Sequence, residues 1–168
     1  EPEHDTAPLI YPCHFDGLFV AWPKENSRKP NAILNSAETQ SLLIPAGIYV
    51  LTKRFTSKEE RRRVVACIYD PSRVQGEHVG FENHLNYIHD SGRGIDMVLA
   101  KGLWAFLNST ALDIYFRQFN GHTQVNATDL CNVRFPSAEQ LRGIGRHISE
   151  EFIGQEEIDQ LVSRESKK

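Results

Sequence analysis

Two polar stretches have residue types that could bind a ligand. The first is KRFTSKEERRR, residues 53–63, with 6 basic and 2 acidic residues. A cluster of this density favours a polyanion, and its candidate phosphate contacts are Lys53, Arg54, Arg61, Arg62 and Arg63. Charge-rich hairpin tips are also commonly only solvated, so both interpretations stay open.

The second stretch is FNGHTQVNATDL, residues 119–130. Short polar side chains compete with helical hydrogen bonds, so a segment this rich in them is predicted to form an ordered loop after a helix. Its hydrogen-bond donors and acceptors are His122, Thr123, Gln124 and Asn126, and such an ordered loop usually binds a partner. The same loop could instead brace the helix against a sheet.

Three histidines, His78, His84 and His89, lie near Glu77 and Glu82 and are the best candidates for a metal site. Their spacings of six and five residues place neither pair on one helical face, and no HExxH or Cys–His pattern occurs. A metal-dependent hydrolase or nuclease is therefore the least favoured function.

Two further motifs could carry chemistry. Cys13 and His14 are adjacent, so a strand would point them to opposite faces, which favours a structural histidine over a catalytic dyad. The stretch HDSGRGID, residues 89–96, could cradle a phosphate at a helix N-terminus, but it lacks the Walker and GxGxxG patterns. A turn into a helix explains its glycines, while Arg93 remains a candidate DNA contact.

Composition sets the class of protein. The chain has 168 residues, 40% hydrophobic and 24% charged, which fits one globular domain. No apolar run approaches the roughly 18 residues of a membrane span. The cysteines, Cys13, Cys67 and Cys131, are widely spaced, which favours reduced thiols and a cytoplasmic protein. No signal peptide is visible, the first residue is Glu1 and the only methionine is Met97, so we expect a fragment of a longer protein.

The formal charge of −3 is unevenly distributed. Residues 8–147 hold 16 basic and 13 acidic residues, whereas the two ends together hold 3 basic and 9 acidic residues. The body of the chain, residues 8–147, is therefore mildly basic and its two ends, residues 1–7 and 148–168, are acidic.

The first half of the chain is predicted to be strand and loop. Residues 47–55 and 62–70 are rich in β-branched and aromatic residues and flank TSKEER, as in a hairpin with a basic tip. Alternation places Val50 and Arg54 on one face of the first strand and Leu51 and Lys53 on the other. A third strand over residues 80–89 is expected to complete an antiparallel sheet.

The second half changes to helical periodicity. Helices are predicted over residues 96–107 and 110–119, with Asn108–Ser109 as a cap between them. Thr128 is expected to cap a short turn, and SAEQ, residues 137–140, has capping-box spacing for a further helix. The predicted fold class is α+β: an antiparallel or mixed sheet with a basic hairpin, packed against C-terminal helices. The predicted divisions are a tail (1–8), one domain (9–148) and an acidic helix or tail (149–168).

The order of three segments adds a family resemblance. YVLTKRFTSKEERRRVVACIYDP, then GFENHLNYIH, then LAKGLWAFLNSTALDIYFRQFNGHTQVNATDLCNVRFPS resembles the C-terminal target-recognition region of type II adenine-specific DNA methyltransferases of restriction–modification systems. The resemblance extends from about Leu9 to Arg146. The last segment is also similar to the end of recognition domains in type I restriction specificity subunits.

The resemblance implies a role in DNA recognition, in which His122, Thr123, Gln124 and Asn126 would contact base edges or phosphates. It also implies a missing partner. Such methyltransferases carry a glycine-containing motif for S-adenosylmethionine and an Asn-Pro-Pro-aromatic motif for the flipped adenine, and this sequence has neither. We expect the fragment itself to be no enzyme and to bind no cofactor, and to position double-stranded DNA for an N-terminal catalytic domain of the same protein. The alternative is a protein-interaction module, which would use an exposed apolar patch and bind without salt sensitivity.

Overall fold

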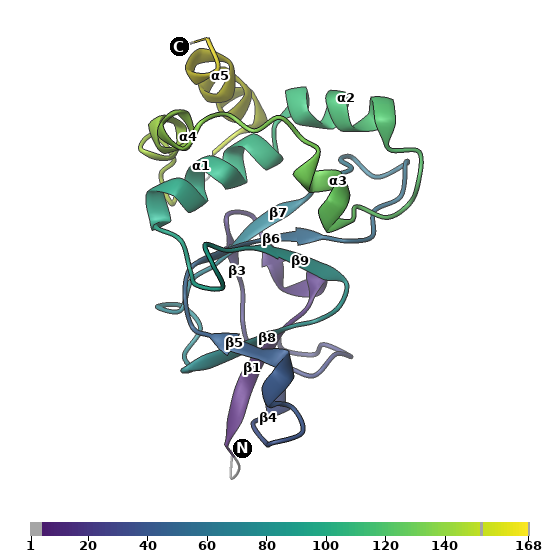
Figure 1. Cartoon of the computed structure of the whole chain (residues 1–168), viewed down its shortest axis with the longest axis vertical. Helices are drawn as coiled ribbons and strands as arrows, with labels where there is room; N and C mark the ends of the chain where they lie inside the picture. Colours follow the sequence, from purple (N-terminus) through teal and green to yellow (C-terminus); the bar gives the residue numbers. More distant parts are fainter. Residues whose placement is uncertain (1–4, 152, 168) are drawn as a thin grey trace.

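The computed structural model describes residues 5–151 and 153–167. The chain forms three layers, with helices on one side, a five-stranded sheet in the middle and a four-stranded sheet on the other side (Figure 1). The first described residues and the C-terminal helix lie at opposite ends of this stack (Figure 1). The predicted α+β class, with sheets packed against C-terminal helices, is confirmed.

The middle sheet is mixed. Its spatial order is β2 (Phe15–Asp16), β3 (Phe19–Val20), β7 (Ala66–Tyr69), β6 (Tyr49–Lys53) and β9 (Leu85–Ile88). Strands β6 and β7 pair antiparallel, as expected of the predicted hairpin, whereas β3 pairs parallel with β7. The 12 residues between β6 and β7, residues 54–65, are called the hairpin connection below. Strand β9 forms one edge of the sheet.

The outer sheet has the order β4 (Ala32–Leu34), β1 (Thr6–Ile10), β8 (His78–Phe81) and β5 (Leu43–Pro45). Strand β1 begins inside the segment predicted as a tail, residues 1–8, of which residues 1–4 lie outside the described residues. Short 3₁₀ helices occupy Pro12–His14 and Gln40–Leu42.

The single strand predicted over residues 80–89 is wrong. Strand β8 belongs to the outer sheet and β9 to the middle sheet, with a turn between them. Glu82 closes this turn, because its carbonyl accepts from the Leu85 N–H at 2.9 Å and its carboxylate accepts from the His84 N–H at 2.9 Å. The segment therefore links the two sheets rather than extending one of them.

The helices are α1 (Met97–Leu107), α2 (Thr110–Phe119), α3 (Ala127–Cys131), α4 (Ala138–Gly145) and α5 (Gln155–Glu165). Ser109 caps α2 by accepting from the Leu112 N–H, and Ser137 with Gln140 forms the predicted capping box of α4. The predicted cap at Thr128 is wrong. Helix α3 begins after Asn126, whose N–H donates to the Asp129 carboxylate at 2.9 Å, so the N-cap lies two residues earlier.

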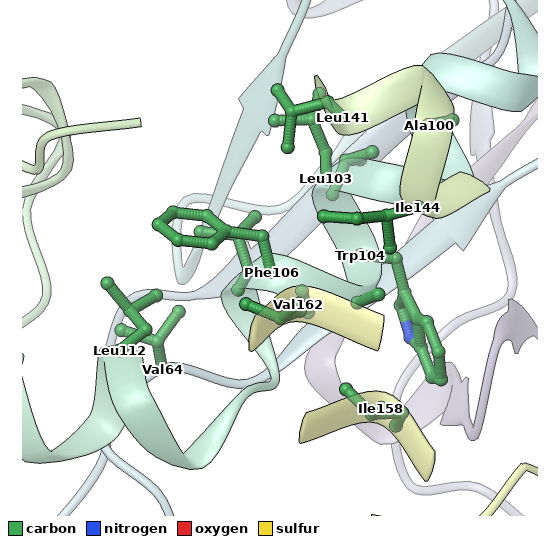
Figure 2. Packing of buried hydrophobic residues seen from close by; sticks show 14 of the residues in the cluster. Val64, Ala100, Leu103, Trp104, Phe106, Leu112, Leu141, Ile144, Ile158 and Val162 are labelled. Atoms are coloured by element: carbon green, nitrogen blue, oxygen red, sulfur yellow. The ribbon is translucent and has the colours of Figure 1, made fainter. Parts of the chain in front are cut away.

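The middle sheet separates two hydrophobic cores. Alternation along β6 places Val50 in the core beneath the helices and Tyr49 and Leu51 in the core between the sheets, as predicted. Figure 2 shows α1 residues such as Leu103 packed against Leu141 of α4. Helix α5 contributes a set of buried apolar residues to the same core: Ile158, Leu161 and Val162. The acidic C-terminal segment therefore includes an amphipathic helix that packs on the domain.

Helices α1 and α4 approach closely enough to require glycine. A Cβ atom on Gly102 would lie 1.9 Å from the Leu141 carbonyl oxygen, and one on Gly145 would lie 1.9 Å from the Val98 carbonyl oxygen. A side chain at either position would therefore force the two helices apart. None of the helices in residues 5–151 and 153–167 is long and apolar enough to span a bilayer.

Candidate nucleic-acid interface

The polar loop after α2 extends the middle sheet. The Thr56 N–H donates to the Thr123 carbonyl at 3.1 Å, and the Val125 N–H donates to the Arg54 carbonyl at 2.7 Å. Phe55 and Gln124 consequently face each other in an antiparallel bridge. The loop therefore lies alongside the start of the hairpin connection, so that the two polar stretches singled out in the sequence are neighbours in space.

Alternation decides which loop side chains point outward. Val125 is fully buried beneath the helices, so its neighbour Gln124 points the other way, to the same side as Phe55. The Phe55 ring is 43% exposed and its centroid lies 5.0 Å from that of His84. Along the edge strand β9 the exposed Tyr87 ring lies 5.3 Å from the His89 ring. These residues form what we call the edge surface: Phe55, His84, Tyr87, His89 and Gln124.

Beneath the edge surface, Arg63 holds the loop from inside. Its side chain is only 1% exposed. The guanidinium donates to the Asn120 carbonyl at 3.3 Å, to the His122 carbonyl and to the Thr56 hydroxyl oxygen at 3.3 Å. The prediction that Arg63 contacts phosphate is therefore corrected. A buried cation is stable only when its N–H groups find acceptors, and the carbonyls of the loop supply them here.

Asn120 is a second inner contact that the sequence interpretation missed. Its amide donates to the Gln124 carbonyl at 3.1 Å and to the Asp129 carboxylate at 3.2 Å, and its side-chain oxygen accepts from the His122 N–H at 3.0 Å. The available signal was an asparagine directly after a helix, followed by an Asn–Asp pair at capping distance. Together with Thr56, Arg63 and Asp129, Asn120 forms the inner network.

Helix α2 clamps the hairpin connection from the side. Arg117 donates to the carbonyls of Lys58 and Glu60 at 2.8 Å each, and it pairs with Asp113 at 2.8 Å. The second Asp113 oxygen accepts from the Arg63 N–H at 2.7 Å. Arg117 and Asp113 were absent from the predicted site, although their i,i+4 spacing on a helix marks them as a pair.

The remaining predicted cations divide into two groups. Lys53, Arg61 and Arg62 line a pocket of about 450 Å³, together with Trp104 and Gln155 of the helical layer. Burial lowers the pKa of the Arg62 guanidinium, and the neighbouring Arg61 charge acts in the same direction.

Arg54 lies with the loop group instead, where its guanidinium donates to the Asn83 carbonyl at 3.3 Å. Of the loop residues, His122 and Thr123 are exposed, Gln124 is half-buried, and Asn126 is half-buried at the N-cap of α3.

Two type II methyltransferases match the chain over almost its whole length. It is 48% identical over 160 residues to M.PstI of Providencia stuartii and 50% identical over 160 residues to M.BsuBI of Bacillus subtilis. These matches cover 95% and 94% of this chain. The chain is homologous to type II methyltransferases. It spans about a third of their length, since the matched region is 32% of each relative. No protein-family model and no solved structure matches the chain.

Other predicted residues of this methyltransferase homologue lie away from the loop. Arg93 is exposed in the turn after β9, at the strand end opposite the hairpin connection, because Lys53 pairs with Leu85 at the start of β9. At the start of α1, Asp96 accepts from the Leu99 N–H at 2.8 Å and pairs with Arg142 at 2.7 Å. A carboxylate already occupies that helix N-terminus, which disfavours a phosphate there.

The histidines do not assemble a metal site. Among residues 5–151 and 153–167, no three His, Cys, Asp or Glu side chains are placed to hold a metal ion. His78 lies in the outer sheet, His84 pairs with Glu82, and the His89 ring accepts from the Gly92 N–H at 2.9 Å.

His14 is the structural histidine that the sequence favours. Its ring accepts from the Tyr11 N–H at 2.9 Å and contacts the Asn31 side-chain oxygen at 3.0 Å. Both ring nitrogens are therefore engaged within the N-terminal segment, and neither is directed at the Cys13 thiol.

Proposed function

We propose that the chain is the DNA target-recognition domain of a longer adenine-specific methyltransferase of a restriction–modification system, in which the predicted residues 9–148 are completed by the start of β1 and by α5. The observation that carries the proposal is a loop whose backbone is fixed from inside while its polar side chains point outward, in a chain homologous to type II methyltransferases. Such a loop meets the requirement for base reading, because donors and acceptors must be held in register before DNA arrives.

The proposed contacts divide by type. Gln124, beside the exposed Phe55 ring, is suited to a bidentate contact with adenine, while His122 and Thr123 extend the same polar surface. The cations would contact phosphates without regard to sequence; Lys58, Arg61 and Arg93 are exposed, and Lys53, Arg54 and Arg62 are half-buried. Asn126 would act mainly as the cap of α3, and Arg63 as part of the inner network.

Catalysis is assigned to a separate region. The sequence contains neither the donor motif nor the adenine motif of the methyltransferases it resembles. We propose that an N-terminal domain of the same polypeptide binds S-adenosylmethionine and grips the flipped adenine in the cytoplasm, while this chain selects the site on double-stranded DNA. The 168-residue chain should show no measurable S-adenosylmethionine binding by calorimetry and no methylation of DNA. Micromolar binding would contradict this assignment.

Selection of DNA sites tests the proposal directly. The longer methyltransferase should enrich one short sequence from a random double-stranded library, and the affinity should fall linearly in a log–log plot against salt concentration. Enrichment of no sequence, or an affinity that salt does not change, would argue against DNA recognition. The matched control is the Gln124→Ala variant, which should keep the salt slope and lose part of the sequence preference.

Protein interaction is the second candidate function, and one observation favours it. Helix α2 exposes three large apolar side chains on its outer side: Ile114, Tyr115 and Phe119. This surface lies on the same helix that clamps the hairpin connection, so a protein contact there is compatible with DNA recognition by the loop.

A further inference from the structure

The outer side of α2 is unusually apolar for a surface helix. Leu112 and Phe116 fill the core on its inner side. On its outer side Ile114, Tyr115 and Phe119 are 56%, 44% and 45% exposed. Within the described residues these are three of the seven large hydrophobic side chains that are exposed, and all three lie on one ten-residue helix. An amphipathic surface helix normally turns polar residues outward, so this side has the character of a contact surface.

The surface is hollowed into a groove. One hollow of about 290 Å³ is lined by Phe106, Ala111, Leu112, Tyr115, Val133 and Arg134. A second hollow of about 230 Å³ is lined by Tyr115, Gln118, Phe119 and Asn132. Tyr115 lines both hollows, so they lie side by side between α2 and the segment after α3, and together we call them the α2 groove. The first hollow is lined by apolar side chains and by the Arg134 guanidinium, and the second also by the amides of Gln118 and Asn132.

The chemistry of the groove indicates a protein occupant. Arg134 is the only charged residue that lines it, and the Arg134 side chain is exposed without an ion pair in the described part of the chain. A nucleic acid would require several cations along its phosphates. An apolar segment with one carboxylate would pack against the apolar lining of the groove and pair with the Arg134 guanidinium.

The lengths of the two homologues suggest the occupant of the groove. The matched region covers 32% of each relative, so about two thirds of a type II methyltransferase has no counterpart in this chain. A partner seated in the α2 groove would rest on the helix whose Arg117 holds the hairpin connection by the carbonyls of Lys58 and Glu60. Docking there would fix the partner relative to the proposed DNA contacts.

We propose that the α2 groove is the docking site for the remaining part of the methyltransferase, which inserts an apolar segment bearing an acidic residue that pairs with Arg134. The proposal rests on the proposed function, in which this chain acts together with a separate catalytic region. It adds the surface through which the two regions are held in a fixed arrangement.

Hydroxyl-radical footprinting of side chains tests the docking without relying on DNA. The oxidation rates of Tyr115 and Phe119 are measured in the 168-residue chain and in the longer methyltransferase, both free of DNA. We expect both rates to be several-fold lower in the longer protein. The matched controls are Leu34 and Leu42, which are also exposed but lie in the outer-sheet layer, and their rates should not change.

Substitutions at the groove provide the second measurement. Tyr115→Glu and Phe119→Glu should lower methylation by the longer protein several-fold, whereas Leu42→Glu should not. The same two substitutions should leave the melting temperature and the DNA affinity of the 168-residue chain unchanged, because neither residue belongs to the core, the inner network or the edge surface. Arg134→Glu should also lower methylation, which tests the charge at the end of the groove.

The outcomes separate the two proposals. Equal oxidation of Tyr115 and Phe119 in both proteins overturns the docking site, even if the chain binds DNA with the expected salt dependence. Protection with no sequence-specific DNA binding leaves the docking site standing and removes the recognition function. If Tyr115 and Phe119 are protected from oxidation in the 168-residue chain when its concentration is raised, the groove binds a second copy of the chain. If they are protected only after DNA is added, the groove binds DNA. Either result overturns the proposal.

Discussion

Arg61 and Arg63 are both arginines of the hairpin connection, but one side chain is exposed and the other is buried. Arg61 is exposed and makes no hydrogen bond or ion pair within the described part of the chain, whereas Arg63, two residues later, is almost wholly buried among loop carbonyls. A run of arginines is therefore not one functional unit. A cation that has lost its water must be held by acceptors, and it then stabilises the fold instead of attracting a partner.

The same division holds in the loop. Asn120 is buried, and its side chain makes four hydrogen bonds in the inner network. Gln124 lies beside Phe55 on the outer side, and within the described residues its side-chain amide makes no hydrogen bond. The sequence left bracing and reading as alternatives for the whole loop. The structure shows that Asn120 braces the loop, and Gln124 stays the residue proposed to contact bases.

The largest effect is expected from removing the buried cation. Arg63→Ala should lower the free energy of unfolding by about 3 kcal/mol, because it leaves several buried carbonyls and the Thr56 hydroxyl without their donor. Thermal or urea unfolding measures this loss. Arg61→Ala is the matched control and should change stability by no more than about 0.5 kcal/mol. An equal loss of stability in both variants would contradict the different roles of Arg61 and Arg63.

Asn120→Ala is expected to cost somewhat less, about 2 kcal/mol, since it removes an uncharged group from the same network. Amide hydrogen exchange should show faster exchange at His122, whose N–H loses its acceptor. Asn132, exposed at the end of α3, offers the control, because Asn132→Ala should leave both stability and exchange in the loop unaltered. Unchanged exchange at His122 in the Asn120 variant would show that the loop does not depend on this contact.

Gln124 and Asn126 sharpen the division between reading and bracing. Gln124→Ala in the longer methyltransferase should reduce discrimination between the preferred and altered sites by about 1–3 kcal/mol with stability unchanged. Asn126→Ala should lower stability by about 1 kcal/mol through loss of the α3 cap and leave the sequence preference intact. Methylation of matched oligonucleotides and melting curves measure the two effects. If Gln124→Ala lowers stability and Asn126→Ala changes the sequence preference, the two residues have the opposite roles.

The smallest effect is expected from the exposed cations. Lys58→Ala and Arg61→Ala should leave folding unchanged and weaken binding to all DNA sequences alike. For each cation that contacts a phosphate, the log–log slope of affinity against salt should fall by about one unit. If the slope stays the same in a variant that lacks both cations, the outer side of the hairpin connection does not face DNA.

Local sequence signals were sufficient for most of the helices and for the hairpin. Met97–Leu107 and Thr110–Phe119 were recognisable because apolar periodicity and the Ser109 cap act over a few residues. The alternation that buries Val50 and Leu51 on opposite faces also depends only on neighbours in the chain. The break at Glu82 was missed, because a turn between two sheets is decided by what each strand pairs with, and those partners are distant in sequence.

Local patterns in the sequence identified helices α1, α2 and α4 and the β6–β7 pair, the basic and polar stretches, and a resemblance of these stretches to a DNA-recognition region. The environment of each side chain, by contrast, depends on contacts made in the folded structure. Arg61 and Arg63 are identical in type and close in sequence, yet the pairing of residues 54–56 with 123–125 encloses Arg63 and leaves Arg61 in water. Burial and acceptor geometry arise from contacts between distant segments, so no local pattern could assign the two arginines their different roles.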